Sequence, residues 1–447
     1  MEILQDVFSY ISNLGSYVMI PIMITLVGLV VRLRVDKAVK AGITVGIGLI
    51  GLDIVLGIIW NHIGPVANLF VEMFDLNMTT IDVGWGAAAG LAFSTVVGSF
   101  IIPFIIVLNI IMLSIKATKT VNIDIWNYWH YAFTGAVVFM LSDNIIYAFV
   151  AAAAHAVIAL KMADLTAPQV QEALGIPGIS IPQGYAVSSV PVYAVLEKFY
   201  DKVLPRSNKE TTVDSSKLSF LSILQEPVFL GLIIGMALAF AVGYNIAQAL
   251  RLGMQMAALM YLLPRMTKII MEGLLPISEQ TRNYMQSKYQ GEQFYIGLDS
   301  AVLLGLPTTV TVGLLLIPIT LAISAILPFN TTLPLGDLAA TAFFISMATP
   351  IHKGSFIRTL ISGTIMICIV LLVASFFAPM LTAFAQSGAV EIPAGALQIT
   401  ALSAGNLIAL GIYLLTSLGI FGVLLVVVLV AAFVYFAMKF EKKGQGE

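Results

Sequence analysis

The sequence contains little charge and almost no cysteine. Only 10% of its 447 residues are charged, whereas soluble domains carry about 25%, so an ordinary soluble fold is excluded. The single cysteine, Cys368, lies in an apolar run and cannot form a disulfide within the chain. The net charge is −2 and no basic patch with interleaved aromatic residues occurs, which argues against nucleic-acid binding.

The motifs of soluble enzymes are also absent. The sequence contains no phosphate-cradling GxxxxGK(S/T) segment and no histidine–cysteine set with metal-ligand spacing. It therefore predicts no cofactor, no metal, no catalytic residue and no ATP-driven transport by this chain alone. The acidic start, Met1–Asp6, lacks the positive region that a cleaved signal peptide requires.

Long apolar segments dominate the chain instead. Hydrophobic residues make up 59% of it, and many segments reach the roughly 20 apolar residues that a bilayer crossing requires. The sequence predicts an all-α polytopic membrane protein with about eleven transmembrane helices. The expected crossings are residues 14–34, 41–60, 94–115, 131–160, 181–199, 225–245, 248–271, 305–327, 337–350, 356–384 and 405–438.

The distribution of lysine and arginine predicts the orientation. If the N-terminus lies outside and the C-terminus in the cytoplasm, 20 of the 22 basic residues fall in cytoplasmic segments, and only Lys161 and Arg251 do not. Cytoplasmic loops retain positive charge, so we expect this orientation. It requires an odd number of crossings, as in the count above.

Two short polar breaks interrupt the apolar chain, at Ile81–Gly86 and Tyr295–Ser300. Each combines an acid, Asp82 or Asp299, with glycine, and the two acids lie 217 residues apart (299 − 82). Paired, glycine-interrupted segments in corresponding halves indicate the substrate site of a transporter with inverted repeats. The sequence therefore predicts a permease with these breaks near its site.

Further landmarks recur in the same order at nearly the same offset. They are the pairs Gly42 and Gly253, Pro65 and Pro276, Pro103 and Pro318, and Asp124 and Asp337. Equivalent loops differ in their lysine and arginine content, which indicates opposite sides of the membrane and hence inverted repeats. The expected units are a first repeat over 1–204, a cytoplasmic linker over 205–219, a second repeat over 220–404, and a final helix with a cytoplasmic tail over 405–447.

The stretches 62–78 and 274–291, which begin near the paired prolines, are amphipathic and too polar to cross a membrane. We expect them to lie along the membrane interface. The alternative is that they are ordinary surface loops.

Acids inside a membrane usually face a cavity or a partner, because an unpaired charge there is costly. Asp82, Asp299 and Asp337 each lie close to glycine at the edge of an apolar run. Re-entrant hairpins would accommodate their broken backbone, which is tolerated only inside protein or beside water. Their carboxylates suit the hydroxyl groups of a polyol or sugar; alternatively, they cap broken helices by accepting backbone N–H bonds.

The run Asn122–His130 is rich in aromatic and polar side chains. Trp126 and Trp129 favour an aromatic belt at the membrane interface. His130 fits a substrate contact as well as it fits packing. His155, on an alanine-rich face, indicates a packed histidine.

Two further residues are candidate substrate contacts. Gln183 stands between Pro182 and Gly184, where broken backbone carries a hydrogen-bonding side chain, and we expect it to contact substrate rather than only to form a turn. Trp85, in the first Asp/Gly break, offers an aromatic face.

A basic segment on the expected cytoplasmic side contains His352, Lys353 and Arg358. These residues either anchor the chain by the positive-inside rule or favour an incoming phosphate group and the docking of a partner that carries it.

Several blocks of the sequence carry a resemblance to a known family. In chain order they are GPVA, DVGW, DIWNYWH, SIPQG, GEQFYIGLD, LPLGDLA and HKGSFIRTLISG. They closely resemble blocks of the galactitol-specific IIC component of the bacterial phosphotransferase system, within the ascorbate–galactitol superfamily. The similarity extends over nearly the whole chain.

The resemblance implies two inverted five-span repeats plus a final helix, arranged as a V-motif domain and a core domain in a homodimer of the bacterial plasma membrane. It also implies an elevator-like movement of the core and group translocation. In group translocation a separate cytoplasmic IIB protein, charged on a cysteine and working with IIA, phosphorylates the sugar that the permease presents. Cys368 lies within the membrane and no IIB-like or IIA-like domain is attached, which fits this division of labour.

The chain departs from the galactitol pattern at positions that bear on its substrate. Gln183 stands where galactitol permeases tend to have histidine, in an IPHG element, and Ser300 stands where proline usually follows GLD.

We therefore expect a IIC permease for galactitol or a related polyol, in which Asp82, Gln183 and Asp299 hold hydroxyl groups and His130 and Asp337 assist. Ascorbate, a pentose or a pentitol is the alternative substrate. A secondary sugar transporter coupled to H⁺ or Na⁺, with the acids as ion sites, is the alternative mechanism.

Overall fold

The computed structural model describes residues 16–30, 32–73, 79–82, 84–122, 124, 126–203, 227–289, 294–334, 336–384 and 398–446. The expected linker at 205–219 lies outside these residues. The described part is mostly helical, and four of its helices are long and apolar enough to cross a membrane: Ile145–Leu174, Pro307–Ile326, Phe356–Phe384 and Ile420–Phe440. This agrees with the expected class of helical membrane protein.

The elements of the first half, in chain order, are α2 (Ser16–Val30), α3 (Val35–Met73), β1 (Thr80–Asp82), α4 (Trp85–Ser94), α5 (Val96–Ser114), β2 (Thr120–Asn122), η1 (Trp126–Tyr128), α6 (Trp129–Ser142), α7 (Ile145–Leu174), β3 (Ile179–Ser180), η2 (Ala186–Ser189) and α8 (Val190–Val203). Those of the second half are α10 (Pro227–Ala241), α11 (Ile246–Tyr289), β4 (Tyr295–Gly297), η3 (Ser300–Gly305), α12 (Pro307–Ile326), β5 (Thr332–Leu333), η4 (Leu338–Ala340), α13 (Thr341–Phe344), α14 (Ala348–Ile351), α15 (Phe356–Phe384), β6 (Gln398–Thr400), η6 (Leu402–Ala404) and α16 (Leu407–Thr416). The helix α17 (Ile420–Gly446) follows them.

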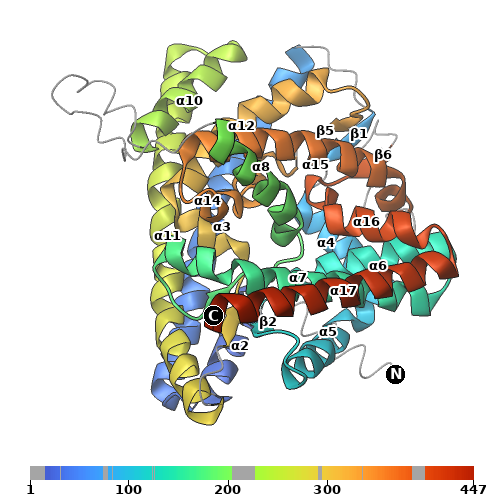
Figure 1. Ribbon diagram of the computed structural model, residues 1–447. Helices are drawn as coiled ribbons and strands as arrows, with labels where there is room; N and C mark the ends of the chain where they lie inside the picture. The colour runs from blue at the N-terminus through green and yellow to red at the C-terminus, as the bar shows by residue number, and fades with distance from the viewer. Residues whose placement is uncertain are drawn as a thin grey trace.

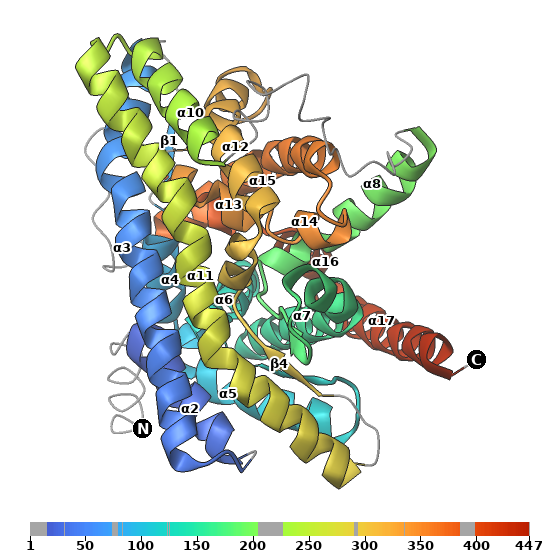
Figure 2. The ribbon, with the colours of Figure 1, turned by 90° about the vertical axis from the view of Figure 1, so that its left-hand side faces the viewer.

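Two long helices, α3 and α11, lie side by side along one side of the molecule, with α2 packed on α3 and α10 packed on α11 (Figure 2). Gly42 and Gly253 mark the two outer contacts. A Cβ at Gly42 would lie 2.3 Å from Thr25 Oγ1, and one at Gly253 would lie 2.7 Å from the carbonyl oxygen of Leu232. The paired glycines of the sequence therefore permit matching close helix contacts.

The amphipathic stretches expected at the interface are not separate segments. Residues 62–73 form the last part of α3, and residues 274–289 form the last part of α11. At 39 and 44 residues, these helices are about 58 and 66 Å long. They extend well beyond the roughly 30 Å hydrocarbon core of a bilayer.

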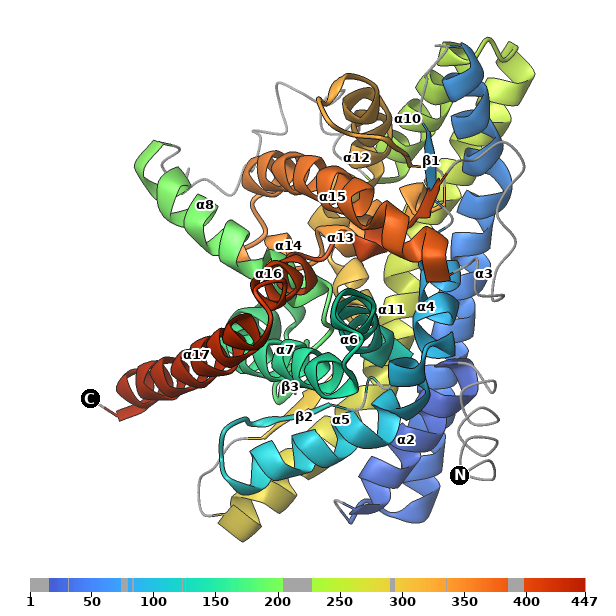
Figure 3. The ribbon, with the colours of Figure 1, turned by 90° about the vertical axis from the view of Figure 1, so that its right-hand side faces the viewer.

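Two three-stranded parallel sheets interrupt the helical fold, which the sequence did not predict. The first has the order β5-β1-β6 and the second the order β2-β4-β3. Each takes its middle strand from one half of the chain and its outer strands from the other half. They lie at opposite ends of the molecule in Figures 1 and 3, with β1 in the upper part of each view and β2 in the lower part.

The two Asp/Gly breaks of the sequence overlap the middle strands of these sheets, β1 and β4. Where a buried chain leaves the helical conformation, its N–H and C=O groups need other partners. In β4 these partners come from both sides, since Ile296 pairs with Val121 of β2 and with Ile179 of β3. The β-branched residues of these short strands suit a flat, buried pleat.

Glycine is required at both breaks for steric reasons. Gly84 has φ of +84°, in the left-handed region, and a Cβ there would lie 3.2 Å from the carbonyl oxygen of Gly336. In β4, a Cβ on Gly297 would lie 2.6 Å from Pro182 Cγ and 2.9 Å from Thr120 Cγ2. The close spacing of the strands depends on the absence of a side chain at position 297.

Four of the expected crossings differ from single helices. The segment 181–199 begins with non-helical residues and contains η2 before α8 starts at Val190. The segment 131–160 is divided between α6 and α7, because Asp143 turns the chain with φ of +49° and the Asn144 side chain caps α7 by accepting hydrogen bonds from Ile146 and Tyr147. The segment 405–438 is divided between α16 and α17 at Gly419, which has φ of +67°. The segment 337–350 contains only η4 and the one-turn helices α13 and α14.

The close packing at Gly297 can be tested by adding a methyl group to the middle strand of the sheet β2-β4-β3. The change Gly297→Ala should push β2 and β3 away from β4 and destabilise the protein by about 1–3 kcal/mol, since overpacking strains a close-packed interior. Thermal unfolding of the purified protein in detergent would measure the effect. The matched control is Gly411→Ala in α16, where a Cβ meets nothing within 4 Å and helix propensity favours alanine. Equal melting temperatures for both variants would contradict this account.

Candidate functional site

Two pairs of carboxylates lie at the carboxyl ends of the two sheets. Asp82 ends β1 and approaches Asp337, which follows β5. Asp299 follows β4 and approaches Asp124, which follows β2, through a side chain that both acids share. Each pair therefore joins one acid from each half of the chain.

The first pair is served by backbone groups. Asp82 accepts hydrogen bonds from the backbone N–H of Gly84 at 2.9 Å, Asp337 at 2.6 Å and Leu402 at 3.3 Å. Asp337 accepts from the backbone N–H of Trp85 at 2.7 Å and of Ser403 at 2.9 Å. We call Asp82 and Asp337 with these N–H groups the Asp82 cluster.

All four carboxylate oxygens of the Asp82 cluster thus accept backbone N–H bonds. Asp337 caps the start of α4, where the helix dipole favours a negative charge. Asp82 and Asp337 are 2% and 0% exposed. This is the geometry of the capping alternative, in which acids stabilise broken helices and turns.

The second pair is served mainly by side chains. Asn127 Nδ2 donates to both oxygens of Asp124 at 2.9 Å and to Asp299 Oδ2 at 2.7 Å. Gln183 Nε2 lies 3.5 Å from Asp299 Oδ1, and Ser300 Oγ donates to Gln183 Oε1 at 2.7 Å. We call Asp124, Asn127, Gln183, Asp299 and Ser300 the Asp299 cluster.

Within the described residues, backbone N–H groups contribute less to the Asp299 cluster: the N–H of Ala301 bonds Asp299 at 2.8 Å, and the N–H of Asn127 interacts with Asp124. Amide and hydroxyl side chains can rotate to exchange one partner for another, whereas backbone N–H groups in a turn cannot. A carboxylate surrounded by such side chains can accept hydrogen bonds from a ligand's hydroxyl groups.

Polar side chains behind the cluster hold β2 in place. Asn109 of α5 donates to the carbonyl oxygen of Thr120 at 2.9 Å and accepts from the backbone N–H of Asn122 at 2.9 Å. Asn122 Oδ1 in turn accepts from the backbone N–H of Asp124 at 3.1 Å. This chain of bonds fixes where the carboxylate of Asp124 lies.

A buried ion pair supports the same strand. Lys161 and Asp164 of α7 lie 3.3 Å apart, with side chains 1% and 0% exposed. Asp164 also accepts hydrogen bonds from the hydroxyl groups of Thr118 and Thr120, both at 2.8 Å. Lys161 was one of two basic residues outside the expected cytoplasmic segments; its charge is paired inside the protein, so the positive-inside rule does not govern it.

The turn that carries Gln183 is held on both sides. Tyr131 donates its hydroxyl hydrogen to the carbonyl oxygen of Pro182 at 2.7 Å, while His155 Nε2 and Asn406 Nδ2 each lie 3.1 Å from the carbonyl oxygen of Gly184. A carbonyl oxygen only accepts, so His155 carries its hydrogen on Nε2. Its Nδ1 then accepts from Thr134, whose hydroxyl lies at 2.7 Å.

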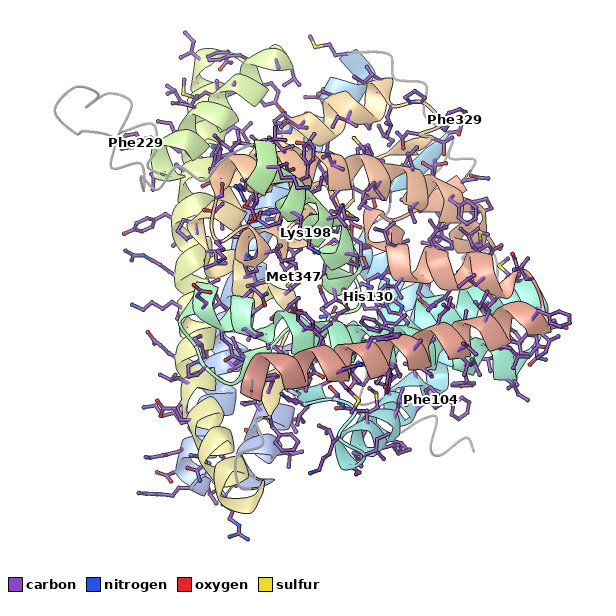
Figure 4. The ribbon with its side chains drawn as sticks, viewed as in Figure 1. Phe104, His130, Lys198, Phe229, Phe329 and Met347 are labelled. Atoms are coloured by element: carbon purple, nitrogen blue, oxygen red, sulfur yellow. The ribbon has the colours of Figure 1, made fainter. Side chains whose placement is uncertain are left out.

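His155 is therefore the packed histidine that the sequence indicated, and it also anchors the turn. His130 lies beside the same turn, because a Cβ on Gly184 would be 3.0 Å from His130 Cβ. Its ring packs against Trp129 and Tyr185, and within the described residues its nitrogens have no hydrogen-bond partner. Figure 4 shows His130 in the interior of the molecule, with Lys198 on α8 above it in this view.

The predicted site residues thus fall into separate groups. Asp299 and Gln183 lie together, with His130 beside the Gln183 turn. Asp82 and Asp337 lie in the other cluster, where Trp85 contributes its backbone N–H while its side chain is 37% exposed.

The belt expected for Trp129 is wrong, because this side chain is 1% exposed and packs in the protein core. The side chain of Trp126 lies outside the described residues.

The three residues of the basic segment, His352, Lys353 and Arg358, lie in different environments. His352 Nδ1 lies 2.6 Å from Glu197 Oε2, and Arg358 bonds Glu197 and Asp201 of α8 at 2.8 Å each. His352 and Arg358 are buried, whereas Lys353 is exposed. Burial lowers the pKa of His352, although the Glu197 carboxylate acts in the opposite direction. Because a carboxylate only accepts, Nδ1–H donates to Glu197.

Sequence reasoning did not assign Asp124, Asn127 and Ser300 to the site. Asp124 served only as a landmark of the repeat, and Asn127 lay unnoticed in the aromatic run. The two departures from the galactitol pattern, Gln183 and Ser300, turn out to be hydrogen-bonded to each other. Among the described residues, no group of three or more His, Cys, Asp or Glu side chains is placed to hold a metal ion.

The capping geometry predicts a stability defect at Asp337. The change Asp337→Asn turns one acceptor oxygen into an NH₂ group that faces a backbone N–H, at a cost of about 1–3 kcal/mol. We expect its melting temperature in detergent to fall further than that of Asp299→Asn, whose carboxylate partners are mostly rotatable side chains. A larger fall for Asp299→Asn would contradict the distinction between the two clusters.

Comparison with known proteins identifies the family. The family model described as "PTS system sugar-specific permease component" matches residues 10–395. The chain is 44% identical over 435 residues, covering 97% of this chain and 99% of the relative, to the "Putative permease IIC component" of Escherichia coli (strain K12). It is 35% identical over 371 residues, covering 83% of this chain and 82% of the relative, to the "PTS system galactitol-specific EIIC component" of the same strain. The galactitol protein of Escherichia coli O157:H7 matches to the same extent.

These matches confirm the resemblance that the sequence blocks indicated. IIC components are multi-pass transport subunits of the inner membrane that work with IIA and IIB partners on a sugar-type substrate, and IIB carries out the phosphoryl transfer. A secondary transporter coupled to H⁺ or Na⁺ is not favoured. The chain belongs to the sugar-specific permease (IIC) family of the bacterial phosphotransferase system.

Proposed function

We propose that this permease carries a neutral polyol of the galactitol class and that the Asp299 cluster binds its hydroxyl groups. The observation that carries the proposal is the contrast between the two acid pairs. They hold corresponding positions in the two sheets, yet backbone N–H groups occupy the oxygens of Asp82 and Asp337, whereas mainly side chains bond Asp124 and Asp299.

The chemistry of the Asp299 cluster suits a polyhydroxyl ligand. Two carboxylates accept hydrogen bonds from hydroxyl groups, and the amides of Asn127 and Gln183 donate to hydroxyl oxygens. His130, beside the Gln183 turn, offers a further hydrogen-bonding group. We assign Asp82 and Asp337 the structural role of holding the opposite sheet and the start of α4, with Trp85 beside them.

The charge of the cluster favours a neutral ligand over an anion. None of the hydrogen bonds of Asp124 and Asp299 comes from a lysine or arginine among the described residues. Two carboxylates without a cation would repel the ascorbate anion, because like charges at this separation are unfavourable in a buried site. A hexitol or pentitol carries no such penalty.

The order of elements supports two inverted repeats, over 1–204 and 220–404, followed by the final helix. Residues with left-handed backbone recur at matching helix ends in the two halves. These pairs are Arg32 and Gly243, 211 residues apart (243 − 32), Lys116 and Phe329, 213 apart (329 − 116), and Asp143 and Lys353, 210 apart (353 − 143). The exchange of middle strands between the sheets has the same symmetry.

In this proposal α2, α3, α10 and α11 form a V-motif that holds a homodimer in the membrane, with the N-terminus outside and the C-terminus in the cytoplasm. The remaining elements form a core that carries both acid clusters and moves as an elevator. Lys353, exposed beside the ion pairs of α8, serves as a contact for the phosphorylated IIB partner, while His352 and Arg358 hold that surface together.

The substrate class is tested by a binding panel on the purified protein. Isothermal titration with galactitol, other hexitols, pentitols, pentoses and ascorbate at pH 7 should show binding of a neutral polyol and none of ascorbate. Tighter binding of ascorbate than of any neutral compound would overturn the proposed substrate class.

The site is tested by Asp299→Asn. Loss of a charged acceptor should weaken polyol binding by about 10- to 100-fold, since hydrogen bonds to charged groups contribute roughly 1.5–3 kcal/mol. Binding and IIB-dependent uptake would be measured beside expression level.

Asp143→Asn is the matched control for that change. Asp143 is exposed at the turn between α6 and α7, with φ of +49°, where asparagine is equally tolerated. Undiminished binding by Asp299→Asn would remove the Asp299 cluster from the substrate site.

A further inference from the structure

We propose that Ser300 is a positioning residue that fixes the amide of Gln183 and thereby sets which pattern of hydroxyl groups the permease accepts. The inference rests on the proposed function, because it concerns specificity at the same cluster. Ser300 is fully buried at 0% exposure, and Gln183 is 9% exposed. The Ser300 hydroxyl lies 2.7 Å from Gln183 Oε1 and 3.4 Å from Asp299 Oδ1, so its shorter contact is with the glutamine.

Hydrogen-bond roles determine the orientation of the Gln183 amide. The Asp299 carboxylate only accepts, so the amide group 3.5 Å away must be the NH₂ end. The carbonyl end then faces Ser300, whose hydroxyl donates to it at 2.7 Å. In the flipped orientation Gln183 Oε1 would face a carboxylate oxygen, placing two acceptors against each other.

The backbone around Gln183 leaves only the side chain free to respond. Bonds from Tyr131 to the Pro182 carbonyl oxygen, and from His155 and Asn406 to the Gly184 carbonyl oxygen, hold the turn on both sides of residue 183. Removing the Ser300 hydroxyl therefore releases the amide without moving the chain that carries it.

The held amide offers a ligand a donor in a defined direction. One hydrogen of Nε2 points toward Asp299, and the second has no acceptor within the described residues and is available to a ligand. A polyol whose hydroxyl oxygen meets this hydrogen is favoured over an epimer that turns the hydroxyl away, because the epimer leaves a buried donor unpaired. An amide that is free to rotate can meet the hydroxyl oxygen of either epimer and therefore does not discriminate between them.

The experiment compares Ser300→Ala, Gln183→Ala and the double variant. The readout is the ratio of dissociation constants for the best polyol of the panel and its epimers. Ser300→Ala should weaken binding of the best polyol by about three- to tenfold and reduce the preference over epimers by a similar factor. In the Gln183→Ala background, the serine change should have no further effect on the ratio.

Ser346→Ala is the matched control, since Ser346 is also 0% exposed and its hydroxyl has no hydrogen-bond partner within the described residues. It should leave the ratio unchanged.

An unchanged ratio in Ser300→Ala, or additive effects of the two single changes, would overturn the inference. If Asp299→Asn abolishes binding while Ser300→Ala preserves the ratio, this inference fails and the proposed function stands; if Asp299→Asn binds normally, the proposed function fails first.

Discussion

The backbone must leave the helical conformation deep inside this protein, and there it still has to pair its N–H and C=O groups. At Thr80–Asp82 and Tyr295–Gly297 it does so by entering small parallel sheets whose outer strands come from the other half of the chain. The positions of both acid clusters follow from this pairing, because parallel strands present their carboxyl ends at one edge. The requirement also explains why Gly84 and Gly297 cannot carry side chains.

The same scaffold is used for two different purposes. At one sheet, backbone N–H groups fill the carboxylate oxygens, and the acids act as caps that hold turns and the start of α4. At the other sheet, Asn127, Gln183 and Ser300 surround the corresponding acids with rotatable groups. In the proposed function, similar backbone geometry supports rigidity at one end of the molecule and ligand exchange at the other, and the side chains near the acids distinguish the two ends.

Much of this arrangement was visible in the sequence, because it depends on spacing. The offset between Asp82 and Asp299, and the paired Gly42 and Gly253, indicated two related halves, and low charge indicated the membrane. The sheets were not predictable, since two or three residues are too few to show an alternating pattern.

The sequence also did not show which polar side chains bond to one another. The contacts of Asp124 with Asn127 and Asp299, and of Arg358 with Glu197, depend on which segments the fold brings together from positions far apart. The expected crossing at 181–199 overlaps α8, and two acids of that helix, Glu197 and Asp201, bond His352 and Arg358 in the interior.

The exchange of middle strands has a consequence for synthesis. Thr80–Asp82 is made before the strands on either side of it, Thr332–Leu333 and Gln398–Thr400, which lie about 250 and 320 residues further along the chain. Protein synthesis proceeds at roughly 5–20 residues per second, so β1 is made tens of seconds before its neighbouring strands. During that time Asp82 lacks the backbone N–H groups of Asp337 and Leu402. Among the described strands, each sheet combines strands of both halves, so neither sheet can be completed until both halves have been made. The first half must therefore enter the membrane while β1 is still unpaired. The sheet is complete only when its last strand, β6, has been made.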